Sequence, residues 1–108
     1  MANVKFVVIY PQPKDLEAFE QVYQKDHVPM AIEKMVGKTK IVTTKVVGSP
    51  QGTPPIYRIA EIHFPSMEVL LVCAASEGAK EALAHAVLIS SGGPPIFLVA
   101  EEETFNFD

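Results

Sequence analysis

The feature that most constrains the fold is the order in which strand-like and helix-like segments alternate along this 108-residue chain. Runs rich in β-branched and aromatic residues predict four strands, and amphipathic runs that follow Asp15, Ser66 and Ser76 predict helices. The predicted strands cover residues 4–10, 39–48, 56–64 and 96–105. The order strand, helix, strand, strand, helix, strand is typical of the ferredoxin-like (split βαβ) α+β fold, an antiparallel sheet with both helices on one face. One domain, residues 1–108, accounts for the whole length.

The first helix carries an apolar stripe that ends in the segment VYQKDHVPM. Leu16, Phe19, Tyr23 and His27 recur at spacings of three and four, which places them on one helix face. Because proline disfavours helical geometry in the residue before it, Pro29 predicts that the regular helix ends near His27. Serine and glycine near residues 76–78 predict a bend between the two parts of the later helical region.

The helices can cover only one face of such a sheet. The first and third predicted strands carry apolar residues on both alternating faces, so the second face should also be covered. A second copy of the chain is the simplest cover, and we therefore predict a homodimer that packs sheet to sheet. In the third strand, Tyr57, Glu61 and His63 share one face, and we treat these three and Phe19 of the first helix as candidates to line a ligand cavity.

Composition and motifs exclude several classes of function. The net charge of -4 and the scattered nine Lys and Arg residues argue against a nucleic-acid partner. The longest apolar run, VLLVCAA, is far too short to span a membrane, so we expect a cytoplasmic protein. Cys73, the single cysteine, should behave as a small buried hydrophobe, and no dinucleotide or phosphate-loop motif suggests an organic cofactor. His27, His63 and His85 lack the spacing of metal ligands, and we expect no metal.

The strongest candidate for chemistry is the pair Tyr23 and His27, one helical turn apart on the face that carries Phe19. A neutral imidazole can take a proton from an acidic C–H or O–H group, and a phenol can orient the oxygen of a ligand. The alternative is structural: His27 would interact with the end of a helix, and Tyr23 would belong to the core. His85, four residues after Glu81, is expected to form a solvated pair with it.

These residues carry a resemblance to a known family. The strand KFVVIYPQP, the pattern of Phe19, Tyr23, His27 and Pro29, the step ASEGAK and the segment GGPPIFLVAEEE resemble the EthD family, named for ethyl tert-butyl ether degradation. The resemblance covers nearly the whole chain. It implies a ferredoxin-like fold that dimerises into an α+β barrel, with a small cavity between helices and sheet that Tyr23 and His27 would face.

The resemblance implies two kinds of function. In the first, the protein is an oxidoreductase, a cofactor-free oxygenase that acts on a small apolar, oxygen-bearing molecule with His27 as general base. In a variant of this, His27 would be an axial ligand of haem. In the second, the protein has no chemistry of its own and binds or delivers such a molecule to a partner oxygenase, with His27 and Tyr23 only orienting it. A purely structural role through the sheet face is a third possibility.

Overall fold

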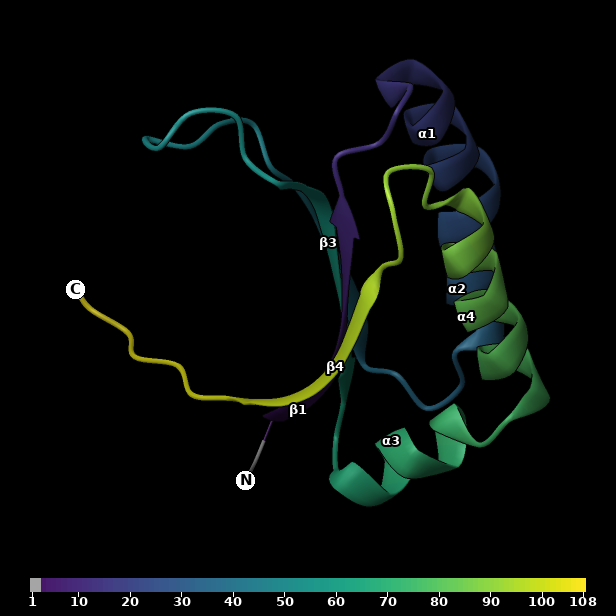
Figure 1. The fold of residues 1–108 in the computed structure, drawn as a ribbon. Helices are drawn as coiled ribbons and strands as arrows, with labels where there is room; N and C mark the ends of the chain where they lie inside the picture. Colours follow the sequence, from purple (N-terminus) through teal and green to yellow (C-terminus); the bar gives the residue numbers. More distant parts are fainter. Residues whose placement is uncertain (1–2) are drawn as a thin grey trace.

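The computed structural model describes residues 3–108 and contains a four-stranded antiparallel sheet with all its helices on one face (Figure 1). The elements are β1 (Asn3–Pro11), α1 (Leu16–Val22), η1 (Tyr23–His27), α2 (Val28–Lys34), β2 (Lys40–Lys45), β3 (Ile56–Phe64), α3 (Met67–Ala74), α4 (Glu77–Ile89) and β4 (Ile96–Glu102). The strands lie in the order β2-β3-β1-β4, and each pairs antiparallel with its neighbours. The predicted ferredoxin-like α+β fold is therefore confirmed.

Local capping explains where three of the helices begin. The side chains of Asp15, Ser66 and Ser76 accept hydrogen bonds from the backbone N–H three residues later, at 3.1, 3.2 and 3.1 Å. Each bond satisfies one of the N–H groups that the first turn leaves without a partner. The bend predicted near Ser76 is a break between two helices, because α3 ends before it and Ser76 caps α4.

The predicted end of the first helix near His27 is wrong. Helical geometry continues through Lys34, and the segment Tyr23–His27 forms a π-helical turn, in which the N–H of Val28 donates to the carbonyl of Tyr23, five residues earlier. Pro29 lies in the first turn of α2, and because it has no N–H it cannot donate to the carbonyls of the preceding helical turn. The wider π-helical turn also leaves room for the proline ring beside the preceding carbonyls, so the chain passes the proline without a break.

The hydrophobic core lies between the sheet and the helices and contains two clusters of buried side chains. The first joins residues of β1 and β3 to α2, α3 and α4, and includes Leu70 and Cys73, each 1% exposed. Burial raises the pKa of the Cys73 thiol, in keeping with the predicted role as a small hydrophobe. The second cluster is aromatic, and it contains Tyr10, Phe19, Tyr23 and Tyr57.

The other face of the sheet carries no helix (Figure 1). The loop between β2 and β3 and the segment after β4 both extend on this side. Strand alternation places Val42 and Leu98 on this helix-free face, and they are 36% and 46% exposed. Phe107, in the segment after β4, is 90% exposed. Within residues 3–108, no helix has the length and apolar character that crossing a membrane requires.

Gly92, in the loop between α4 and β4, approaches the chain just after β1 very closely. A Cβ atom at this position would overlap the backbone oxygen of Gln12, so Gly92→Ala forces two backbone segments apart. We expect this substitution to lower the free energy of unfolding by about 2–3 kcal/mol or more, measured by urea denaturation. Gly48→Ala is the matched control, because nothing lies within 4 Å of its added Cβ, and it should change stability by less than about 0.5 kcal/mol. Equal effects of the two substitutions would show that the contact at Gly92 is not constrained.

Candidate small-molecule site

The centre of the candidate site is His27, a buried histidine with both ring nitrogens hydrogen-bonded inside the protein. His27 is 7% exposed. Its Nε2 lies 3.1 Å from the hydroxyl of Tyr10, on β1, and its Nδ1 lies 2.9 Å from Nδ1 of His85, on α4. Three elements, β1, η1 and α4, thus meet at one imidazole.

Aromatic rings surround this histidine along the helix. Phe19 stacks on Tyr23 at 5.4 Å between ring centroids, and Tyr23 stacks on His27 at 5.8 Å. The π-helical turn keeps Tyr23 and His27 on one side of the helix, so the structure brings these sequence candidates together. Tyr10 meets Phe19, Tyr23 and His27 edge to face, at 5.4, 5.5 and 6.2 Å.

Burial sets the protonation states of these groups. Removal from water, with a smaller contribution from nearby His85, lowers the pKa of His27 to about 4. Burial raises the pKa of Tyr23 to about 12, and burial with the neighbouring Tyr23 raises the pKa of Tyr10 further. At neutral pH the site therefore contains a neutral imidazole and two neutral phenols, an arrangement suited to an apolar ligand that offers an oxygen.

A small apolar cavity of about 30 Å³ lies next to His27, between the helices and the sheet. Its walls are formed by Val8, Tyr23, His27, Val28, Ala31, Ile41, Thr43, Ala60 and Ile62. Tyr23, His27 and Thr43 are its polar residues, and all the others are aliphatic. This space is enough for one or two water molecules, so a larger ligand must push its walls apart.

Tyr57 reaches the helix side of the sheet through a break in strand alternation. The pairing of β1 with β3 shifts between Tyr10 and Pro11, so that Tyr57 has no direct partner on β1 and its side chain turns. Its ring packs against Phe19 at 5.8 Å, and its hydroxyl donates to Glu20 at 2.8 Å. Arg58 donates to both oxygens of Glu20, at 2.6 and 3.0 Å, and lies over the ring of Tyr23. Tyr57 thus supports the aromatic group around His27 from one end.

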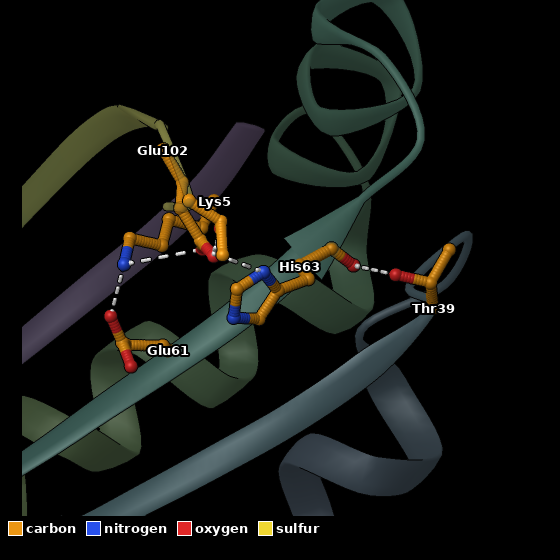
Figure 2. Close-up of polar contacts among 6 residues, drawn as sticks. Lys5, Thr39, Glu61, His63 and Glu102 are labelled. Atoms are coloured by element: carbon orange, nitrogen blue, oxygen red, sulfur yellow. Dashed lines mark hydrogen bonds and ion pairs between the residues drawn. The ribbon is translucent and has the colours of Figure 1, made fainter. Parts of the chain in front are cut away.

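Glu61 and His63 lie elsewhere, in a polar cluster on the helix-free face of the sheet (Figure 2). Lys5 donates to Glu61 and lies 3.6 Å from Glu102. Nδ1 of His63 is also 3.6 Å from Glu102, and its backbone carbonyl accepts a bond from the Thr39 hydroxyl at 3.3 Å (Figure 2). The structure therefore separates these two sequence candidates from His27 by the thickness of the sheet.

Sequence reasoning missed two residues that contact His27 directly, Tyr10 and His85. The expected pair of His85 with Glu81 is not formed, because Glu81 binds Lys34 of α2 at 2.7 Å. The signal for His85 was its position next to the small buried face of α4 made by Ala79, Ala82 and Ala86. The signal for Tyr10 was its place on the same alternating face of β1 as the buried residues Val4 and Val8.

The described part of the chain contains no preformed metal site. Among residues 3–108, no three or more His, Cys, Asp or Glu side chains are placed to hold one ion. The two histidines that do meet, His27 and His85, are joined through their Nδ1 atoms.

Comparisons with known proteins show which proteins this fold resembles. No protein-family model matches the chain. An EthD family protein of known structure from Bacillus halodurans superposes with a TM-score of 0.86 and 27% identity, over 95% of this chain and all of that one. An EthD-like protein from Ralstonia eutropha superposes with a TM-score of 0.70 and 16% identity, over 94% and 92% of the two chains. The resemblance to the EthD family is confirmed.

A curated relative has a similar level of sequence identity. The chain is 27% identical over 99 residues to an uncharacterized 11.0 kDa protein from the thcB-thcC intergenic region of Rhodococcus erythropolis, covering 91% of this chain and 94% of that protein.

More distant structures share the fold alone. A dimeric ferredoxin-like protein of unknown function from Jannaschia superposes with a TM-score of 0.66 and 12% identity, over 93% and 99% of the chains. SnoaB, a cofactor-independent oxygenase from Streptomyces nogalater, gives a TM-score of 0.64 and 14% identity, over 95% of each chain.

The low pKa of His27 predicts a specific dependence of stability on pH. The folded protein binds a proton at His27 only near pH 4, whereas the unfolded chain does so near pH 6.5. Between these values the unfolded chain binds more protons, so the free energy of unfolding should fall as the pH is lowered through this window, by up to about 3 kcal/mol from His27. Above pH 6.5 this contribution is constant.

The measurement is urea denaturation at pH 7 and pH 4.5 for the wild type and for His27→Gln. The wild type should lose more stability than the variant between the two pH values. His63→Gln, on the other face of the sheet, serves as control. Because it retains His27, it should still show the loss of stability at low pH that His27 causes in the wild type. If wild type and His27→Gln lose the same amount, burial does not hold His27 neutral.

Proposed function

We propose that this chain binds a small apolar molecule with a hydroxyl or carbonyl oxygen next to His27, and that His27 takes a proton from it. The observation that carries this proposal is the neutral, buried imidazole of His27, which bonds Tyr10 and His85 and faces an apolar cavity. A general base must be unprotonated before it acts, and a pKa of about 4 keeps His27 in that form at neutral pH.

Removing a proton from a phenol or hydroquinone gives an electron-rich anion, which can react with molecular oxygen directly. A protein that does this needs to hold the substrate, remove the proton and exclude water, all of which a buried apolar cavity with one base can supply. The likeness to a cofactor-independent oxygenase supports this reading at the level of the fold. Tyr23, whose pKa of about 12 keeps it protonated, would donate a hydrogen bond to the developing oxygen anion.

Entry of a ligand requires the cavity to widen. The wall formed by Ile41 and Thr43 belongs to β2, an edge strand that is hydrogen-bonded to β3 alone. The opposite wall, at Val28 and Ala31, belongs to the helix that follows the π-helical turn. Separation of these two elements would open the cavity without disturbing the central strands β1 and β3.

This proposal predicts that catalysis depends on His27. Wild type, His27→Gln and the control His63→Gln would be incubated with a panel of phenols, hydroquinones and naphthols in air, with oxygen uptake and products followed by electrode and mass spectrometry. We expect turnover in wild type and His63→Gln, and a loss of about 10²-fold or more in His27→Gln. Full activity in His27→Gln would overturn the role of His27.

A delivery function without chemistry is the second candidate, and one observation favours it. Both nitrogens of His27 already bond protein groups, so neither is free to take a proton from a ligand until one of these bonds is released. In this case the protein would pass an apolar intermediate to an oxygenase partner. Saturable binding of panel members by ligand-observed NMR, weakened in His27→Gln and without any product, would identify a carrier rather than an enzyme.

We propose further that the working form is a homodimer joined through the helix-free face. Apolar residues of the two edge strands, Val42 on β2 and Ile96 and Leu98 on β4, lie exposed on this face. The protein from Jannaschia, which shares the fold and is described as dimeric, supports a dimer. The segment after β4, which contains the exposed Phe107, extends on this side of the sheet and would be covered by the second copy.

The dimer can be tested with one substitution on each face. In sedimentation velocity the wild type should show twice the 11.8 kDa mass of the chain. Leu98→Glu would bury an unpaired charge between the sheets, so it should give monomers at micromolar concentration. Val72→Glu, at a 69% exposed position on α3, should remain dimeric. A monomeric wild type, or a dimeric Leu98→Glu, would contradict the sheet-to-sheet arrangement.

A further inference from the structure

We propose that His85 is the outer member of a proton relay, in which a proton taken up at His27 leaves through His85 to solvent. The proposal rests on the proposed function of His27 and adds the route by which the proton leaves that base. His85 touches no ligand in this scheme; it acts through His27 as a positioning and relay residue.

The hydrogen bonds of His27 require one defined arrangement of protons. A neutral imidazole has one N–H and one acceptor nitrogen, so one contact of His27 must be donated and the other accepted. The hydroxyl of Tyr10 is fully buried, and within residues 3–108 its acceptor is His27 Nε2, at 3.1 Å. If Tyr10 donates to Nε2, the proton of His27 lies on Nδ1 and is donated to Nδ1 of His85 at 2.9 Å. Any other arrangement leaves the buried Tyr10 hydroxyl without an acceptor, which is costly.

The far side of His85 is open to water. His85 is half-exposed, whereas His27 is buried. Among residues 3–108, the side-chain nitrogen or oxygen that is both fully buried and unbonded is Nε of Arg58. Because Nε2 of His85 has no bond to a protein group in that range and is not among such buried atoms, it is accessible to solvent. The path therefore runs from the cavity to water in two bonded steps.

The relay leaves the number of protons on each ring unchanged. A ligand proton arrives at Nε2 of His27 as Tyr10 releases that nitrogen, and His27 passes its Nδ1 proton to Nδ1 of His85. His85 then loses its Nε2 proton to water, and both rings are neutral again with their tautomers exchanged. The net result is one proton moved from the ligand to solvent, with no oxidation or reduction of either ring.

The groups around His27 favour passing a proton on to His85 over holding it on His27. Its ring is faced by Tyr10 of β1, Tyr23 of the π-helical turn and His85 of α4, and none of these groups carries a negative charge at neutral pH. The nearby carboxylate on α4, Glu81, is paired with Lys34 at 2.7 Å. A positive charge on buried His27 thus has no counter-ion, whereas a charge on half-exposed His85 is hydrated.

The test uses the ligand-free protein, so that its failure is independent of any ligand or activity. Nitrogen-15 NMR of the imidazoles should show the proton of His27 on Nδ1, with a coupling through the hydrogen bond to Nδ1 of His85. The decisive quantity is the rate at which this proton exchanges with water, measured by magnetisation transfer. In wild type the relay should make exchange rapid.

Two variants separate the relay from a simple hydrogen bond. His85→Gln keeps an oxygen that can accept from Nδ1 of His27 but cannot pass a proton on, and His85→Phe keeps a ring to stack on. In both, exchange must wait for local opening and should slow by about tenfold or more. Tyr10→Phe, which leaves the exit through His85 intact, should keep rapid exchange.

The relay is overturned by equal exchange rates in wild type and both His85 variants, or by slow exchange in Tyr10→Phe alone. In either case the test of His27 with phenolic substrates would stand on its own. Should one His85 variant fail to fold, judged by its thermal transition, the other still decides the matter, and so do the tautomers of the wild type.

Discussion

The passage of Pro29 through a continuous helix is the constraint on which the site depends. Proline lacks an N–H and crowds the carbonyl four residues before it, so an ordinary helix would break or bend at this point. Here one π-helical turn, Tyr23–His27, accommodates the proline, and α2 follows without interruption. This turn holds Tyr23 and His27 stacked on one side and presses both against the sheet. Without it the imidazole would sit at a helix end near solvent, where a proton is easily held.

Burial then determines what the site can do. Tyr10, Tyr23 and His27 are each 7% exposed or less. Burial shifts the pKa of each group in the direction that favours its neutral form. These three side chains form a polar line inside the apolar core, and none of them carries a charge at neutral pH. Such a line costs little to bury, because its hydrogen bonds are satisfied between Tyr10, His27 and His85. It can also accept and pass on a proton, which an isolated core histidine cannot do.

The two faces of the sheet divide the polar residues between separate tasks. The helix side holds His27 and its partners, and Glu20 joins Tyr57 and Arg58 at one end of the same aromatic group. The helix-free side holds Lys5, Glu61, His63 and Glu102 among exposed apolar residues (Figure 2). A charged network of this kind is suited to fixing the register of a second sheet rather than to chemistry, since its members already bond one another.

The sequence by itself determined the order of the elements, the three helix caps at Asp15, Ser66 and Ser76, and the ferredoxin-like fold. These follow from local rules: alternation for strands, caps for helix starts, and the few topologies open to this order. It also determined that Phe19, Tyr23 and His27 share a helix face, since their spacing does. It misjudged the effect of Pro29, because the rule for the residue before proline describes an α-helix and not a π-helical turn. Only the tertiary structure decided that Tyr10 and His85 meet His27, because residues 17 and 58 positions apart are joined by packing alone. For the same reason, the register shift at Tyr57 and the separation of Glu61 and His63 from the site became visible only when the strands were paired.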